Sequence, residues 1–240
     1  MFFNRGKTLQ STKIGDLNVI VEKATHPAKI GVLILHGYGA DFSDLAGLRS
    51  MLDPQHEADW YFPNGILSVH IGPYMTGRAW FQIDAEAIEK SMQMGLHRDF
   101  KSIRPDGIDF AIERIMPLYN QLRDKYDKLI IGGFSQGAML TTDLCMVAEK
   151  KPEALIIMSG AYLDAESWNA KMHAVAPICF FQSHGNQDPL LSFDDARLLN
   201  KKLNQQGWQG EFVGFDGGHE IPGTVLEELK QFLQPFFQFN

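Results

Sequence analysis

A serine stands between two glycines in the stretch IGGFSQGAM, residues 131–139. Its core, GFSQG, has the Gly-x-Ser-x-Gly spacing in which a sharp strand-to-helix turn exposes a serine hydroxyl. Short patterns of this kind also arise by chance in ordinary glycine-rich turns. Ser135 is therefore a candidate nucleophile, and the hypothesis requires a general base, an orienting acid and an oxyanion site elsewhere in the chain.

Partners for this serine follow later in the chain, each in a loop after an expected strand. Asp188 lies in FFQSHGNQDPLL, and His219 lies in FVGFDGGHEIPG. The order Ser, Asp, His is the order that this type of turn requires. Because parallel strands present their carboxyl ends at one edge of a sheet, we expect the three side chains to meet there. We predict Ser135 as nucleophile, His219 as general base and Asp188 as the acid that orients it.

Other titratable residues compete for these roles. Asp194 and Asp195 begin an expected helix, where acidic residues commonly complement the helix dipole. Asp216 is closer to His219 in sequence, and we expect it to form the turn. His184 is an alternative base, but it precedes the acid at a strand end, which favours a structural role.

An oxyanion formed during attack on a carbonyl needs two backbone N–H donors. One expected donor is the N–H of Gln136, directly after the serine, at the N-terminus of a helix. The other is the N–H of Tyr38, in the loop ILHGYGAD at residues 34–41. We expect His36, in the same loop, to brace it rather than to act as a second base.

Strand and helix patterns alternate along the chain in a way that would position these residues. Apolar, β-branched runs bounded by turn residues predict strands at 17–23, 30–37, 58–65, 128–135, 153–161, 176–185 and 210–218. Helical periodicity predicts helices at 107–126, 136–149, 193–206 (capped by Ser192, with Asp195 three residues on) and 224–237. The middle strands are hydrophobic nearly throughout, as in a parallel sheet covered on both faces. The pattern predicts a doubly wound α/β sheet in a single domain over residues 1–240.

Residues 66–104 break this alternation. They contain no good strand pattern, but a Gly/Pro/aromatic stretch and a short helix with methionines, AEAIEKSMQMG. Long excursions in compact domains are usually lids or binding loops. The apolar side chains here either line a groove for an acyl chain or pack the excursion onto the body, and such a surface also allows a homodimer. Candidate substrate contacts are Met75, Trp80, Phe81 and Met92.

Composition limits the classes of partner. Twenty-nine acidic against 22 basic residues give a net charge of −7, which argues against nucleic acid or an anionic membrane surface. The sequence shows no signal-peptide pattern and no apolar run of membrane-spanning length, so we expect a cytoplasmic protein. Cys145 and Cys179 are expected as reduced thiols. The C-terminal FLQPFFQF is expected to form the core face of the last helix rather than a membrane contact.

Six motifs in order, LHGYGAD, PNG, RAWF, GFSQGAM, SHGNQDP and GGHEIP, resemble the phospholipase/carboxylesterase family of α/β hydrolases. That family contains acyl-protein thioesterases and small bacterial carboxylesterases, and the resemblance covers about residues 18–235. It implies an α/β-hydrolase fold, a triad of Ser135, Asp188 and His219, no cofactor, no metal, and short-to-medium acyl esters or thioesters as substrates. It also implies that Trp80 walls the acyl site.

The leading functional hypothesis is a serine carboxylesterase that works through an acyl-enzyme. The chain departs from the family pattern at three points. It has Tyr38 where leucine is common, Gln82 where many members have aspartate, and a longer excursion. These differences bear on the substrate rather than on the reaction. Alternatives are an acyl-protein thioesterase, a lysophospholipid hydrolase, acyl transfer to an acceptor other than water, and a non-catalytic acyl-binding protein. A dienelactone-hydrolase-like enzyme is disfavoured because that chemistry would put cysteine at position 135.

Overall fold

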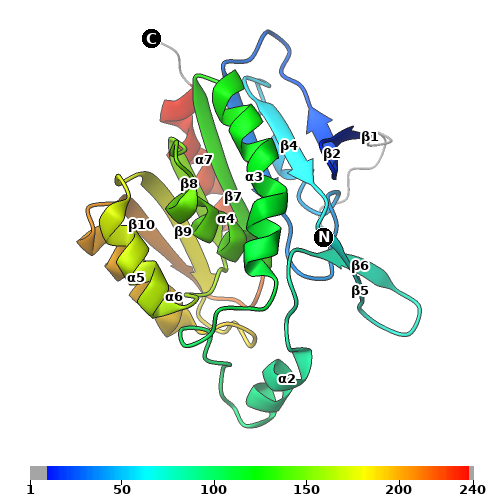
Figure 1. Ribbon diagram of the computed structural model, residues 1–240. Helices are drawn as coiled ribbons and strands as arrows, with labels where there is room; N and C mark the ends of the chain where they lie inside the picture. The colour runs from blue at the N-terminus through cyan, green and yellow to red at the C-terminus, as the bar shows by residue number, and fades with distance from the viewer. Residues whose placement is uncertain (1–9, 238–240) are drawn as a thin grey trace.

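The fold is built on a twisted, mostly parallel β-sheet (Figure 1). The computed structural model describes residues 10–237, and within them the main sheet has eight strands in the order β1-β2-β4-β3-β7-β8-β9-β10. From β4 to β10 neighbouring strands are parallel, while β1 and β2 form an antiparallel edge. The strands are β1 (Ser11–Ile14), β2 (Leu17–Glu22), β3 (Ile30–Leu35), β4 (Asp59–Pro63), β7 (Lys128–Phe134), β8 (Ala154–Met158), β9 (Cys179–Gly185) and β10 (Gln209–Phe215).

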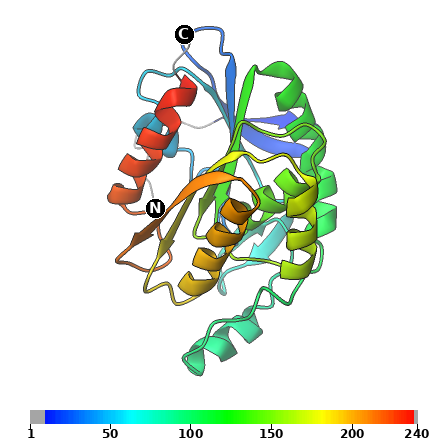
Figure 2. The same ribbon diagram turned by 90° about the vertical axis from the view of Figure 1, so that its left-hand side faces the viewer.

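Helices cover both faces of this sheet because its central strands are apolar on both sides. In β3, for example, Leu33 and Leu35 enter one core while Val32 and Ile34 enter the other. The first core is covered by α3 (Ile108–Lys125), α4 (Gln136–Val147), α5 (Ala165–Ala174) and α6 (Phe193–Gln205). The second is covered by α1 (Leu48–Leu52) and α7 (Gly223–Phe237), which lie together on the opposite side in Figure 2. The predicted doubly wound sheet with helices on both faces is confirmed.

The predicted strands and helices outside the excursion are present, with ends that shift by up to three residues. The predicted cap also forms, since the Ser192 hydroxyl accepts the N–H of Asp195 at 3.2 Å. Three elements outside the excursion, β1, α1 and α5, were not predicted. α5 buries only Trp168 and Met172, so its sequence carries little helical periodicity.

The prediction that residues 66–104 lack strands is wrong. They contain a hairpin of β5 (Leu67–His70) and β6 (Thr76–Ala79), followed by α2 (Ala85–Gln93) at the expected methionine-bearing helix. The hairpin and α2 project from the body in Figure 1. Each strand has four residues with little buried apolar surface, so no apolar alternation identified them. Main-chain bonds hold the hairpin instead, for Gly39 N–H donates to Arg78 O and Arg78 N–H donates to Ala40 O, both at 2.8 Å.

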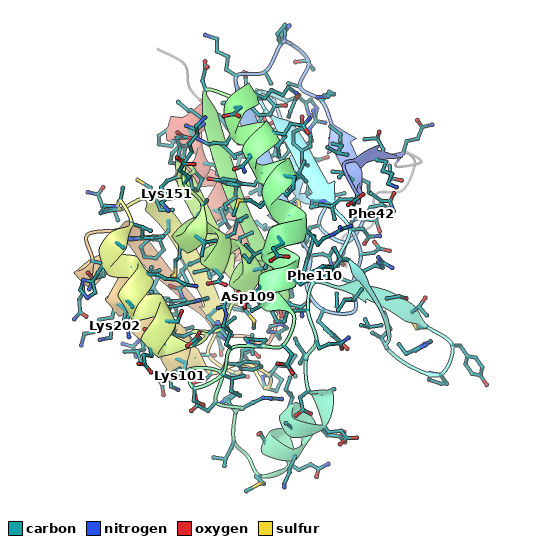
Figure 3. All side chains as sticks on the ribbon, viewed as in Figure 1. Phe42, Lys101, Asp109, Phe110, Lys151 and Lys202 are labelled. Carbon is teal, nitrogen blue, oxygen red and sulfur yellow. The ribbon has the colours of Figure 1, made fainter. Side chains whose placement is uncertain are left out.

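Arg104 ties the end of this excursion to the helical layer. Its guanidinium lies 2.9 Å from Asp143 Oδ2 in α4 and also pairs with Asp109 in α3. The Asp143 side chain is fully buried, and it further accepts the Trp168 indole N–H at 3.0 Å and Lys171 Nζ at 3.1 Å. Among the side chains in Figure 3, Asp109 is labelled near the lower end of α3, where this cluster forms.

Replacing Asp143 with alanine is expected to lower the free energy of unfolding by about 3 kcal/mol, because it removes the buried carboxylate that pairs with both Lys171 and Arg104. The value lies at the low end of the usual range because the Arg104 and Lys171 side chains are 27% and 28% exposed. Urea unfolding measures it. Asp124→Ala is the control, since its pair with Lys150 is exposed and contributes less than about 1 kcal/mol. Equal losses in the two variants would contradict this account.

The structure also places the two cysteines and the C-terminal aromatic segment. Cys145 is buried, Cys179 is partly buried, and neither forms a disulfide. Phe232 and Phe236 of the C-terminal segment pack against the core under α7, whereas residues 238 and 239 of that segment lie outside the described residues. Over residues 10–237, every helix is too short or too polar to cross a membrane.

Candidate active site

Ser135 occupies a sharp turn between β7 and α4. Its φ is 55° and its ψ is −118°, a conformation that L-residues seldom adopt and that marks a strained, functional turn. The flanking glycines allow the turn to approach β3 closely. A Cβ atom at Gly133 or Gly137 would lie 2.6 Å or 2.1 Å from the Leu35 carbonyl oxygen, closer than atoms can pack. The Gly-x-Ser-x-Gly spacing thus lets the turn press against β3 while the serine faces a cavity.

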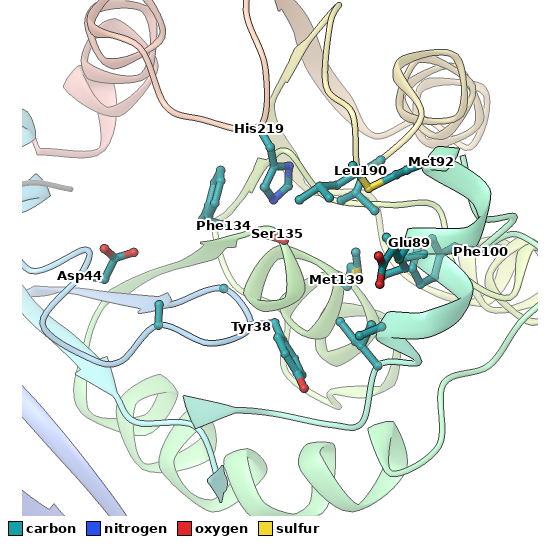
Figure 4. Close-up of a pocket in the computed structure, with 16 residues that line it drawn as sticks. Tyr38, Asp44, Glu89, Met92, Phe100, Phe134, Ser135, Met139, Leu190 and His219 are labelled. Carbon is teal, nitrogen blue, oxygen red and sulfur yellow. The ribbon is translucent and has the colours of Figure 1, made fainter. Parts of the chain in front are cut away.

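His219 and Asp188 meet at the same edge of the sheet. Asp188 follows β9, His219 follows β10, and His219 Nδ1 lies 2.7 Å from Asp188 Oδ2. Figure 4 shows the His219 ring pointing toward Ser135, and both residues line one cavity. The ring packs against Phe134, with centroids 4.8 Å apart and ring planes tilted by 45°. The sequence order Ser, Asp, His therefore becomes a spatial cluster.

The Asp188 carboxylate is held from two sides. Oδ1 accepts the N–H groups of Leu190 at 2.8 Å and Leu191 at 3.0 Å. Oδ2 faces His219 Nδ1 and, at 3.2 Å, His184 Nε2. Burial alone would raise the pKa of Asp188, but hydrogen bonds from His184 and His219 outweigh burial and hold that pKa well below its usual range. The carboxylate is therefore ionised at neutral pH. Because it accepts a hydrogen bond from His219 Nδ1, the proton of the neutral ring is on Nδ1, and Nε2 is free to accept a proton.

The loop after β3 is braced by His36. The Gly65 N–H donates to His36 Nε2 at 2.9 Å, so the proton of the ring is on Nδ1, which donates to Gly37 O at 2.8 Å. Burial lowers the pKa of His36, which keeps it in this neutral form. The Trp80 indole N–H donates to His36 O at 3.0 Å. This is the bracing role expected from the sequence.

The two predicted oxyanion donors belong to segments next to the serine. Tyr38 lines the cavity, and a Cβ atom added at Gly37 would be 3.3 Å from Ser135 Cβ, so their loop passes next to the nucleophile. Gln136 begins α4, and its buried side chain accepts the Trp80 N–H at 2.9 Å and donates to Phe81 O at 2.8 Å. The side chain thus fixes the helix start, and the assignment of both backbone N–H groups as donors stays a prediction.

The cavity next to Ser135 has a volume of about 390 Å³, in the range of small-molecule sites. α2 supplies Ile88, Glu89 and Met92 to it, across from the serine turn (Figure 4). Most of the lining is apolar: Ile83, Ile88, Met92, Phe100, Phe134, Met139, Leu190 and Leu191. In the described part of the chain, no three or more His, Cys, Asp or Glu side chains are arranged to hold a metal ion. The absence of a metal and of a cofactor stays a prediction.

Comparison with known proteins decides the family. The family model described as Phospholipase/Carboxylesterase matches residues 16–236. The chain belongs to the phospholipase/carboxylesterase family. Acyl-protein thioesterase 1 of Debaryomyces hansenii is 27% identical, over 92% of this chain and 94% of that protein. Acyl-protein thioesterase 1 of Candida albicans is 25% identical, over 86% and 92%.

Solved structures show that this phospholipase/carboxylesterase family member has the α/β-hydrolase fold. Esterase PE8 superposes with a TM-score of 0.74 and 24% identity, covering 91% of this chain and 98% of that one. Acyl-protein thioesterase 2 of Zea mays gives 0.69 at 18% identity, covering 92% and 99%. The predicted fold and the predicted enzyme class, a carboxylic ester hydrolase, are confirmed.

Of the predicted substrate contacts in this family member, the structure brings Met92 to the cavity and leaves the other three outside its lining. Met75 lies in the turn between β5 and β6 and is 62% exposed. Trp80 and Phe81 are fully buried and bond to His36 and Gln136, so they support the loops around the serine. Their contact with a substrate stays a prediction.

Sequence reasoning missed several residues of the site. Phe134 and Leu190 line the cavity, and their positions beside Ser135 and just after Asp188 were a usable signal. His97, at the end of the α2 segment, has Nε2 2.8 Å from Asp188 O. No local pattern indicates that contact, because 91 residues separate the partners.

Proposed function

We propose that this protein hydrolyses short-to-medium acyl carboxylic esters through a serine acyl-enzyme. Ser135 is the nucleophile, His219 the general base and Asp188 the acid that orients it. The observation that carries the proposal is the 2.7 Å contact of His219 Nδ1 with buried Asp188, at a cavity shared by His219 and the strained Ser135 turn. An ionised aspartate bonded to an imidazole, with that imidazole and a serine of positive φ lining one apolar cavity, supports this role.

In the first half-reaction, Ser135 Oγ attacks the acyl carbonyl carbon while His219 Nε2 takes the hydroxyl proton. The imidazolium that forms is stabilised by ionised Asp188. The negative charge that develops on the carbonyl oxygen is stabilised by the N–H groups of Tyr38 and Gln136. Collapse of the tetrahedral intermediate breaks the bond to the leaving group, which departs with the proton from His219.

In the second half-reaction, water replaces the leaving group. His219 takes a proton from water, the resulting hydroxide equivalent attacks the acyl-enzyme, and Ser135 recovers its proton as the carboxylic acid leaves. The apolar lining of the cavity suits an acyl chain, because burying each methylene contributes about 0.8 kcal/mol.

Thioester hydrolysis is the second candidate. It is favoured by curated relatives named acyl-protein thioesterase 1, at 25–27% identity over most of the chain. The same triad serves both reactions, because attack on the carbonyl and formation of the acyl-enzyme are shared. Only the leaving group differs.

A chain-length series of esters and matching thioesters tests the proposal. We expect kcat/KM to rise with chain length while carbons enter the cavity and to fall beyond medium chains. Met92→Ala should lower kcat/KM several-fold at the optimum, since its side chain lines the cavity. Met94→Ala is the control, because Met94 is 65% exposed and lies outside the lining. A rate that keeps rising to long chains would contradict the short-to-medium assignment, and a uniform thioester preference would favour the second candidate.

The proposal extends to assembly and compartment. A homodimer through the excursion is supported by its exposed apolar side chains, which include Tyr74, Met94 and Leu96. Cytoplasmic localisation, expected from the sequence, is part of the same proposal.

A further inference from the structure

The catalytic carboxylate has a second histidine partner that the triad does not use. His184 is near the end of β9 and is fully buried. Its Nε2 lies 3.2 Å from Asp188 Oδ2, the same oxygen that His219 Nδ1 contacts at 2.7 Å. Two imidazoles therefore converge on one carboxylate oxygen, one from the cavity and one from the protein interior.

The contacts of His184 determine where its proton is. Nε2 also lies 3.2 Å from the Leu191 carbonyl oxygen. Because a carboxylate and a carbonyl both accept, Nε2 carries a hydrogen that the two oxygens share. Nδ1 is buried without a hydrogen-bond partner. A second proton there would be a buried donor without an acceptor, which is costly, so His184 is a neutral donor directed at Asp188.

We propose that His184 is a positioning residue for the catalytic acid. Its N–H holds Oδ2 in place and withdraws part of the negative charge that this oxygen would otherwise present to His219. The inference rests on the proposed triad. The N–H groups of Leu190 and Leu191 fix the other carboxylate oxygen, Oδ1. Without His184, the side chain of His219 would be the one side-chain partner left to Oδ2 among the described residues.

Loss of this donor should have a directional effect on pH dependence. With His184 removed, more of the Asp188 charge acts on His219, so the imidazolium form of His219 is stabilised further. The acid limb of the kcat/KM profile should then move to higher pH. The rate at the plateau should fall, because a carboxylate with fewer fixed partners orients the imidazole less well.

Other titratable groups around this cluster stay unchanged in the variants. His97 donates to the Asp188 carbonyl oxygen from the α2 segment. Asp216 pairs with Gln187 at the end of β10, and Glu220 accepts the Gly218 N–H at 3.3 Å beside His219. Asp216→Asn is the control for these groups, since Asp216 is exposed and its side chain pairs with Gln187 rather than with Asp188 or His219. It should leave the acid limb at its parent position.

The test compares His184→Phe with His184→Gln. Phenylalanine keeps a ring and removes the donor, whereas glutamine places an amide N–H near the position of Nε2. In the phenylalanine variant we expect kcat to fall about 10-fold, KM to stay unchanged and the acid limb to rise by about half a pH unit. In the glutamine variant kcat and the acid limb should return most of the way to the parent values. The low-field proton resonance of the His219 Nδ1–H should shift in the first variant and be restored in the second.

If His184→Phe folds with a parent-like Tm and has parent kcat and acid limb, His184 only packs and the inference is overturned. If the phenylalanine variant does not fold, His184→Asn replaces it, because its shorter amide cannot reach the carboxylate. Equal activity of the asparagine and glutamine variants would also overturn the inference. Failure of the triad itself is separate, since it would appear as parent-like turnover in Ser135→Ala, in a protein whose His184 is unchanged.

Discussion

Replacing Ser135 with alanine should lower kcat by about 10⁴-fold or more. The hydroxyl supplies the atom that forms the acyl-enzyme, so its removal leaves only the oxyanion donors and binding to accelerate hydrolysis. Folding should be retained, because alanine and serine meet the same restriction at a φ of 55° and no hydrogen bond of the described residues depends on Ser135 Oγ.

Hydrolysis of p-nitrophenyl acetate measures the rate, and a fluorophosphonate probe measures the nucleophile directly. Ser159→Ala is a matched control. Ser159 also has positive φ, at 45°, and is fully buried with a hydroxyl that lacks a partner, so its loss should leave kcat and labelling unchanged. The assignment fails if the Ser135 variant turns over at the parent rate. An unlabelled parent protein would instead favour the non-catalytic acyl-binding alternative.

Much of the fold was predictable because its central strands are buried on both faces. β7 and β8 contain LIIGGF and ALIIM, runs that are too apolar for a surface strand. α3 buries Ile108, Ala111, Ile112, Ile115, Leu118, Tyr119 and Leu122, a helical stripe that is visible in the sequence. Such elements carry their own signal, since each must bury apolar surface.

The hairpin of β5 and β6 carries no such signal. It is stabilised by main-chain hydrogen bonds to the loop of Gly39 and by close approach of glycines, since a Cβ atom at Gly77 would lie 1.9 Å from Gly39 O. Backbone pairing is independent of side-chain type, so sequence patterns do not show it. α1 and α5 were missed for a related reason, because a five-residue helix and a helix with two buried residues offer too few positions for periodicity.

The candidate site also has parts that the sequence predicts and parts that it does not. That Ser135, Asp188 and His219 lie at one edge of the sheet was predictable from motif order and strand ends, whereas their catalytic roles stay a prediction. Which side chains line the cavity was less predictable. Trp80 and Met92 both lie in the excursion and both are apolar, yet Trp80 is fully buried and Met92 is 41% exposed at the cavity. That distinction depends on how the excursion packs, which is a tertiary property.

Replacing Asp188 with asparagine should be nearly as severe as removing the serine, with kcat lowered by about 10⁴-fold. Asparagine keeps the shape and size of aspartate, but one of the two acceptor oxygens becomes an NH₂ group, which donates hydrogen bonds. Leu190 and Leu191 donate N–H groups to Oδ1, so the amide oxygen of asparagine will occupy that position. Its NH₂ group then faces His184 and His219.

A donor at that position reverses the protonation of the catalytic imidazole. His219 Nδ1 must accept from the amide, so the proton of the neutral ring moves to Nε2, which can no longer take a proton from the serine. The loss is thus one of kcat, with KM close to the parent value. Asp216→Asn is the matched control, because Asp216 is exposed and pairs with Gln187 rather than with His219. If Asp216→Asn were the inactive variant and Asp188→Asn the active one, the acid of the triad would be Asp216.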